Sequence, residues 1–273
     1  MTRLRLGLLG PMQVTLNQQP IVTFPYEKVR ALLAYLATES NHPHHRDRLA
    51  TLLWADQCES KARSNLRKAL SMLRQMLEDI ADHSPLFLTT RNTIQFNPVA
   101  DHSLDVTIFT QLIDRYLHHS QPASDLCPES VSGLEQAVAL YRGPFLEQVH
   151  LPDNETFEIW AALTRQRLHD LVINIYVKLV TYYEQQQEYH KAQQHVQRQL
   201  QLEPWNEVAH RCLMRILTQR GRRTEALQQY DRCCKLLKQE LATEPEPATI
   251  TLWEAIRSDE YRTKVCQSLS KVN

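Results

Sequence analysis

Apolar residues at the start of the chain alternate with polar ones, which is the pattern of half-buried strands. Turn-forming residues separate the runs, with Gly10-Pro11 after the first and Asn17–Pro20 after the second. The pattern predicts short antiparallel strands joined by turns. Their apolar positions are Leu4, Leu6 and Leu8, then Val14 and Leu16, then Ile21 and Val22.

The apolar period then changes to that of a helix. Val29, Leu32, Leu33 and Leu36 lie at i, i+3, i+4 and i+7, and no Gly or Pro interrupts them. Similar spacing predicts two further helices, and two β-prone runs follow as a hairpin with a polar, cationic tip. The predicted elements are helices over Tyr26–Thr38, His45–Trp54 and Ser60–Leu77, then strands over Leu86–Thr90 and Thr93–Phe96 that are joined at Arg91-Asn92.

The remainder of the chain is predicted to be helical. Apolar residues at helical spacing mark three segments, and breaks rich in Pro, Ser, Asp or Gly separate them. The predicted helices cover Asp105–His118, Pro128–Tyr141 and Glu155–Gln186.

An internal repeat follows the longest of these helices. Tyr189–Ala192 and Arg223–Ala226 share a frame 34 residues apart, which is the tetratricopeptide period. Tyr183, Ala192 and Pro204 take the aromatic, small and terminal proline positions of one unit, and Gly221, Ala226 and Tyr230 correspond in the next. The second unit departs from the pattern by extending its last helix to Pro245. The repeat predicts a helical solenoid, which either binds a partner or serves only as a scaffold.

Charge is balanced overall but not along the chain. Lys+Arg and Asp+Glu each number 31. Residues 1–97 contain 12 basic and 8 acidic side chains, whereas residues 98–273 contain 19 and 23. The predicted helix Ser60–Leu77 contains five basic residues and no acidic one. It would bury a leucine-rich stripe and present cations outward.

Such a helix has the chemistry to contact DNA, because phosphates attract Lys and Arg while Arg and Asn can read base edges. The alternative is an ordinary solvated face. Two features favour DNA: the helix lacks the interspersed acidic residues of most exposed helices, and it is third in a helix-helix-helix-hairpin order. The candidate DNA-binding residues are Lys61, Arg63, Ser64, Asn65, Arg67, Lys68, Ser71 and Arg74 on the helix, with Arg91 and Asn92 at the hairpin tip.

Several stretches together resemble a known family. They are Leu6–Pro11, Val29–Leu36, Arg46–Leu49 with Leu52–Trp54, Asn65–Leu70, Leu140–Leu146 and Glu240–Pro245. The set is similar to activators of the Streptomyces antibiotic regulatory protein (SARP) type. The turn Phe24–Lys28 departs from that family, in which it is usually richer in Gly and basic residues, so phosphate contacts from that turn are not expected.

The resemblance implies a mainly α fold, with an OmpR-like winged helix-turn-helix bearing small antiparallel sheets over residues 1–97. An all-α, tetratricopeptide-like bacterial transcriptional activation domain would occupy residues 100–262, and a tail residues 263–273. It implies a sequence-specific transcriptional activator that binds repeated half-sites in double-stranded DNA, self-associates there and assists RNA polymerase. The rival interpretation is a protein-interaction adaptor without specific DNA binding.

Other chemistry has little support in the sequence. Only five glycines are present, and no phosphate-binding loop or catalytic constellation is recognisable, so we expect neither an enzyme nor a cofactor. His42, His44 and His45 lie in a predicted connector without further ligands at metal-binding spacing. The six cysteines form no framework and are expected to be reduced and mostly buried, including one of Cys233 and Cys234. No signal-peptide or membrane-spanning pattern is visible, which predicts a cytoplasmic protein.

Overall fold

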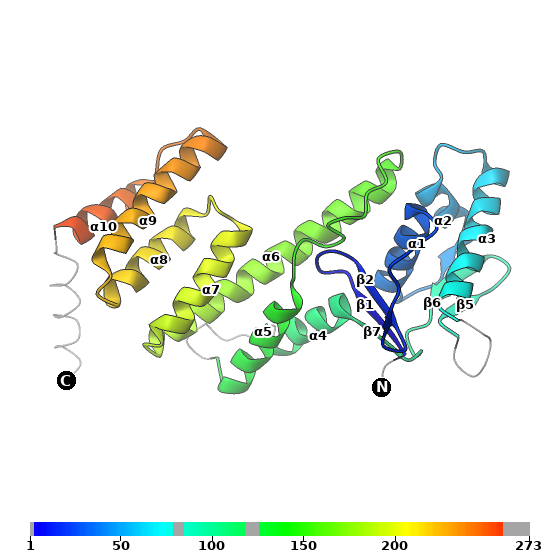
Figure 1. The fold of residues 1–273 in the computed structure, drawn as a ribbon, viewed down its shortest axis with the longest axis horizontal. Coiled ribbons are helices and arrows are strands. Elements are labelled where there is room, and N and C mark those ends of the chain that lie inside the picture. Colours follow the sequence, from blue (N-terminus) through cyan, green and yellow to red (C-terminus); the bar gives the residue numbers. More distant parts are fainter. Residues whose placement is uncertain (1–2, 79–84, 118–125, 259–273) are drawn as a thin grey trace. The chain divides into compact units, whose positions relative to one another are not determined.

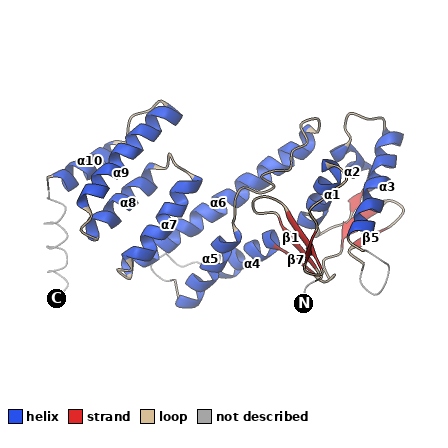
Figure 2. Ribbon diagram, in the orientation of Figure 1, coloured by secondary structure: helices blue, strands red, loops and turns tan. Residues whose placement is uncertain are grey.

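A computed structural model describes residues 3–78, 85–117 and 126–258. It confirms the predicted fold class: the described residues are mainly helical, and their strands all precede residue 105 (Figures 1 and 2). Contacts group the chain into two compact units, residues 1–119 with 133–172 and residues 120–132 with 173–273. The predicted tail, residues 263–273, lies outside the described residues.

The first unit begins with a four-stranded sheet of order β3-β2-β1-β7. Strand β1 pairs antiparallel with β2 and parallel with β7, so that Leu6 lies opposite both Val14 and Leu104. These three side chains are buried. The bounds are Leu4–Gly7 for β1, Gln13–Leu16 for β2, Gln19–Pro20 for β3 and His102–Leu104 for β7.

Two details of this sheet differ from the prediction. The third strand is Gln19–Pro20, and Ile21 and Val22 follow it. Asn17 and Gln18 both have positive φ, at 48° and 68°, and form a two-residue turn that lets pairing resume at Gln19. Strand β7 was not predicted, because its three residues carry no alternating pattern long enough to read.

Three helices and a second sheet follow in the predicted order. The second sheet has the order β4-β6-β5. His44 and His45, predicted as the end of a loop and the start of a helix, instead form a short strand that pairs with Ile94 and Thr93. The bounds are Glu27–Thr38 for α1, His44–His45 for β4, Arg46–Leu53 for α2, Glu59–Met76 for α3, Phe87–Thr89 for β5 and Thr93–Phe96 for β6.

The core of these helices matches the apolar periodicity. The four residues that predicted α1 are fully buried, and Trp54 is buried as expected for a core residue. Phe87 and Phe96 pack edge to face, with ring centroids 5.7 Å apart, and anchor the hairpin below its tip. The leucine-rich interior therefore holds α3 and the hairpin in fixed positions.

Three more helices enter the first unit: α4 (Asp105–Leu117), α5 (Pro128–Leu140) and the beginning of α6 (Glu155–Gln185). They begin and end close to the predicted residues. A side chain at Gly133 would place its Cβ 2.1 Å from the ring of Tyr116, so α4 and α5 approach through this glycine.

Two stretches that resemble the SARP family contact each other in this unit. Gly10 donates its backbone N–H to Pro144, and Leu146 donates to Leu8, at 3.1 and 2.9 Å. The amides of Leu8 and Leu9 both donate to the carboxylate of Asp105, at 2.8 and 2.9 Å. The segment around residue 144 therefore packs on the first sheet.

The beginning of α6 is also tied to the three-helix core. The indole Nε1 of Trp160 donates to Glu39 at 2.9 Å, and its ring packs edge to face with Tyr35 at a centroid distance of 4.8 Å. These contacts fix the first turns of α6 against the end of α1.

The second unit shows the predicted repeat. Helices α7 (Tyr189–Leu202) and α9 (Arg223–Leu236) each have 14 residues, and they begin 34 residues apart. Helix α8 (Glu207–Gln219) lies between them in the chain. Ala192 and Ala226 are fully buried, as close packing of paired helices requires.

The end of the second repeat differs from the prediction. Helix α9 continues only through a π-helical turn, Leu237–Leu241, and does not reach Pro245. Ala242 then adopts a left-handed conformation with φ of 53°, which ends the helix. A further helix, α10 (Pro247–Arg257), follows.

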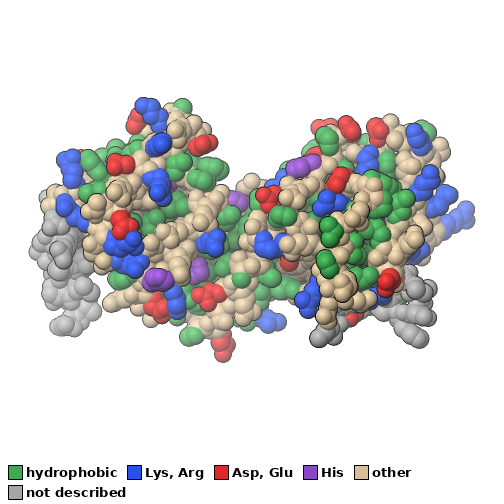
Figure 3. Space-filling view, in the orientation of Figure 1, with side chains coloured by type: hydrophobic (Ala, Val, Ile, Leu, Met, Phe, Trp, Pro, Cys, Tyr) green, Lys and Arg blue, Asp and Glu red, His purple; other side chains and the backbone are tan. Residues whose placement is uncertain are grey.

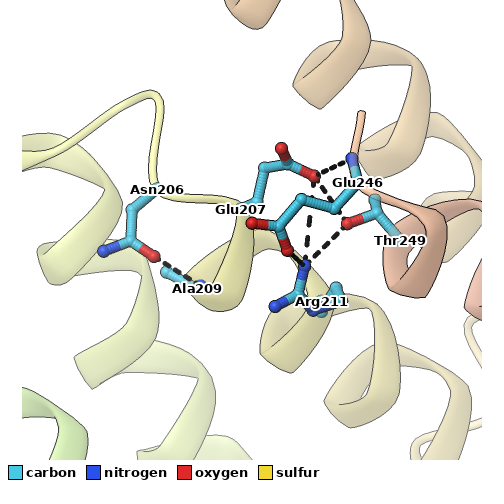
Figure 4. Close-up of polar contacts among 6 residues, drawn as sticks. All are labelled: Asn206, Glu207, Ala209, Arg211, Glu246 and Thr249. Atoms are coloured by element: carbon cyan, nitrogen blue, oxygen red, sulfur yellow. Dashed lines mark hydrogen bonds and ion pairs between the residues drawn. The ribbon is translucent and has the colours of Figure 1, made fainter. Parts of the chain in front are cut away.

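A polar network attaches α10 to α8 (Figure 4). One carboxylate oxygen of Glu207 accepts from the Glu246 amide at 2.9 Å and from the Thr249 hydroxyl at 2.7 Å. Arg211 donates to Glu246 at 2.7 Å and to Thr249 at 2.9 Å. Thr249 is fully buried, so each polar atom at this junction depends on the others.

Candidate nucleic-acid interface

Helix α3 buries one face and leaves the other in solvent. Ala62, Leu66, Ala69, Leu70 and Leu73 are buried, as the periodicity predicted. The opposite face contributes to an edge of the molecule where Lys and Arg side chains gather (Figure 3).

Three predicted cations on α3 are exposed and uncommitted. The side chains of Lys61, Arg67 and Lys68 make no hydrogen bond or ion pair with any residue that the structure describes, and Ser71 is exposed beside them. An uncommitted cation loses no protein contact when it meets a phosphate. These side chains therefore have the properties of a surface that binds an anionic partner.

Arg63 is exposed but paired. Its guanidinium lies 2.5 Å from Asp47 and 2.7 Å from Glu59. The hydrogen bond from Arg63 lowers the pKa of Asp47, and the same bond raises the pKa of Arg63. The sequence pattern did not reveal this pairing, because Asp47 comes from α2 and Glu59 lies one residue before the predicted helix Ser60–Leu77.

Three other predicted residues on α3 are half-buried. Asn65 is half-buried and donates to Gln57 at 2.9 Å. Arg74 is half-buried and donates to the hydroxyl of Thr89, on β5, at 2.9 Å. Ser64 is half-buried as well. Arg74 links the helix to the hairpin in this structure.

The hairpin tip is ordered by its own side chains. The Thr90 hydroxyl accepts from the backbone amides of Asn92 and Thr93, at 3.2 and 2.9 Å. Arg91 and Asn92 are exposed at the tip, where the sequence placed them. The turn therefore presents one cation and one amide on a short, braced loop.

A hollow of about 690 Å³ lies between these elements. Its walls come from the start of α2, from α3 and from the hairpin tip, and it brings four predicted residues together. These four are Arg63, Arg67, Arg91 and Asn92.

Arg46 also lines this hollow, and sequence reasoning did not select it for DNA binding. Its backbone amide donates to Asn92, and its guanidinium donates twice to the carbonyl of Thr90, each at 3.2 Å. Burial lowers the pKa of Arg46, and the charges of Arg74 and Arg67 lower it further. Arg46 therefore lies in positively charged surroundings, which favour an anion beside it.

The histidines and cysteines near this surface are not arranged as a ligand cluster. His44 is buried and its Nε2 lies 2.8 Å from the carbonyl of Glu39. Among the described residues, no group of three or more His, Cys, Asp or Glu could hold a metal ion.

Cys58 and Cys127 are exposed, which corrects the expectation of mostly buried thiols, whereas Cys212 and Cys233 are buried and Cys234 is half-buried.

Within the described residues, every helix is too short or too polar to cross a lipid bilayer.

Comparison with known proteins gives a consistent assignment. Residues 104–257, more than half of the chain, match the model of the family described as "Bacterial transcriptional activator domain". The chain is also 29% identical over 147 residues to the transcriptional regulatory protein EmbR of Mycobacterium bovis and of Mycobacterium tuberculosis. That alignment covers 54% of this chain but 37% of EmbR, so the chain spans little more than a third of these relatives in matched sequence.

The fold is also that of a solved structure. The structure of Mycobacterium tuberculosis EmbR in complex with a low-affinity phosphopeptide superposes with a TM-score of 0.70 at 22% identity. The superposition covers the whole of this chain and 71% of that one. The predicted resemblance to SARP-type activators is thereby confirmed.

Proposed function

We propose, from the premise that this chain belongs to the bacterial transcriptional activator domain family, that it activates transcription by binding specific sequences in double-stranded DNA. The observation that carries the proposal is the hollow between α2, α3 and the hairpin tip. It combines exposed, uncommitted Arg67 with a hairpin that presents Arg91 and Asn92. A helix that enters the major groove beside a hairpin that contacts the backbone requires this arrangement.

The candidate residues divide into two roles. Lys61, Arg67, Lys68 and Arg91 are exposed cations without partners among the described residues, and we assign them to phosphates and base edges. Arg46 and Arg74 donate hydrogen bonds to the hairpin and would orient it.

Arg63, Ser64, Asn65, Ser71 and Asn92 complete the proposed surface. Arg63 would contact DNA only by exchanging a carboxylate partner for a phosphate, and Asn65 by releasing Gln57. We therefore expect Arg63 and Asn65 to contribute less than Arg67.

We further propose that two protomers bind repeated half-sites side by side and assist RNA polymerase there. The support is family membership and the extended helical unit, which offers surface for protein contacts. We also place the protein in the cytoplasm, where such a regulator meets DNA.

The test is selection of bound sequences from a random DNA pool with the full-length chain, followed by titration of the selected site against salt. We expect a repeated half-site spaced by about one helical turn, and affinity that falls steeply as salt rises. Lys235→Ala, which removes an exposed cation from α9, is the matched control and should leave the affinity unchanged. Absence of enrichment together with salt-insensitive binding would reject the proposal in favour of a protein-interaction adaptor.

A further inference from the structure

The second unit contains its own hollow, of about 520 Å³, formed by α7, α8 and α9. Its lining differs in chemistry from the surface on α3, because five carboxamides and five apolar side chains contribute to it. The amide side chains are Gln193, Gln197, Gln201, Gln228 and Gln229, and the charged ones are Arg222, Glu225 and Arg232.

The floor of this hollow is a buried polar pair. His210 and Gln229 are 1% and 6% exposed. His210 Nε2 lies 2.8 Å from the carbonyl of Pro204, which can only accept, so Nε2 bears the proton. Nδ1 then accepts from the Gln229 amide at 2.6 Å, so the imidazole is neutral and fixed in one orientation. The floor of the hollow therefore has a fixed arrangement of polar atoms.

Several side chains at the rim of this hollow already form hydrogen bonds within the chain. Arg222 forms two short bonds with Glu225, at 2.6 and 2.5 Å. The amide oxygen of Gln193 accepts from Arg222 and Arg220, and Gln201 accepts from Arg198. The Arg222–Glu225 pair carries no net charge, and the amide contacts hold this side of the hollow in place.

Three side chains remain uncommitted. Gln197 on α7 and Gln228 and Arg232 on α9 are exposed, and none makes a hydrogen bond or ion pair with a described residue. A carboxamide can donate and accept at once, which matches the alternating N–H and C=O groups of an extended peptide. The guanidinium of Arg232 can hold a carboxylate in a bidentate pair.

We propose that this hollow binds an extended segment of a partner protein, with a Glu or Asp side chain of that segment placed on Arg232. Gln197 on α7 and Gln228 on α9 form hydrogen bonds with the backbone of the segment. A nucleic acid fits less well, because duplex binding needs several uncompensated cations and the described lining offers only Arg232. The inference does not depend on the DNA-binding proposal, since no residue is shared.

The experiment measures fluorescence anisotropy of labelled octapeptide pools with the full-length chain, in the absence of DNA. One pool has two central Glu residues in a Gly, Ser and Ala background, and matched pools have Gln or Lys at those positions. We expect the Glu pool to bind roughly tenfold more tightly than the Gln pool. Arg232→Glu should remove this preference and favour the Lys pool, whereas Lys235→Glu, one turn further along α9, should change nothing.

Gln197→Ala supplies a second, independent readout. It should weaken the Glu and Gln pools by the same few-fold factor, because it removes a backbone contact and leaves the charge recognition unchanged. Equal binding of all pools, or a Glu preference that survives Arg232→Glu, would overturn the proposal. So would a labelled single-stranded oligonucleotide that displaces the Glu pool.

Discussion

The two hollows of this protein differ in how their polar side chains relate to the core. The surface on α3 and the hairpin places cations outside a leucine core, and most of these cations have no part in folding. The hollow of α7, α8 and α9 is built on a buried His–Gln pair that also belongs to the interior. Removing a cation without a side-chain partner, such as Arg67, from the first surface should therefore cost binding alone, whereas polar changes inside the second unit should cost stability.

The largest effect is expected at the junction of α8 and α10. Glu207→Ala removes an acceptor that serves the Glu246 amide and the Thr249 hydroxyl, and it leaves both donors without that partner. We expect a loss of about 3 kcal/mol in the free energy of unfolding. Urea denaturation measures it. Glu254→Ala, an exposed carboxylate on α10, is the control, and an equal loss in both variants would contradict the assignment.

The next effect concerns DNA. Arg67→Ala should lower the affinity for the selected site by roughly 1–3 kcal/mol if Arg67 reads a base, with relaxed preference at one position. Uniform weakening on all sequences would make it a phosphate contact. Thermal melting should not change, because the side chain has no partner among the described residues. A large drop in melting temperature would show that Arg67 also stabilises the fold.

The third effect is a pH dependence shared by both units. Burial lowers the pKa of His210 and of His44, so the folded state resists protonation of each. The unfolded histidines titrate near their ordinary value of about 6.5, so stability is full above that pH and falls as the pH decreases below it. Each histidine contributes at most roughly 1.4 kcal/mol per pH unit.

Urea midpoints between pH 7.5 and 5.5 (roughly one unit either side of that value) test this expectation. His210→Gln should flatten the acidic slope, and the parent slope should persist in His190→Gln, whose histidine is exposed. An unchanged slope in His210→Gln would show that His210 becomes protonated without loss of stability.

The smallest effect is expected at the hairpin. Arg46→Ala removes two bonds to the carbonyl of Thr90 and should cost about 1 kcal/mol in DNA affinity through a less ordered tip. Arg46→Lys retains the charge but loses the planar guanidinium that donates twice to Thr90. Its affinity should therefore lie between those of the parent and Arg46→Ala. Full recovery with Lys would make Arg46 a simple phosphate contact.

Much of the fold was predictable because its helices are long and amphipathic. The apolar spacing in α1 and α3 and the 34-residue repeat depend on local periodicity, and the structure confirms them. Strands β4 and β7 could not be predicted, since two or three residues carry no period and their pairing partners lie far along the chain.

The candidate site was predictable as a surface but not residue by residue. Spacing places Arg67 and Arg74 on neighbouring parts of one helix, yet only the fold brings Thr89 to Arg74 and Asp47 to Arg63. Whether a cation is committed depends on contacts between separate elements. The DNA contacts themselves stay predictions.

Strand β7 determines where the N-terminal part of this protein can be cut without opening its first sheet. A fragment ending at residue 97 would lack the parallel neighbour of β1, and it would also lack Asp105, which binds the amides of Leu8 and Leu9. The unpaired edge of β1 would then be available to other chains, a common route to aggregation. A graft of this DNA-binding surface onto another protein should therefore keep the segment that returns to the first strand, since the boundary that sequence similarity suggests is not where the sheet ends.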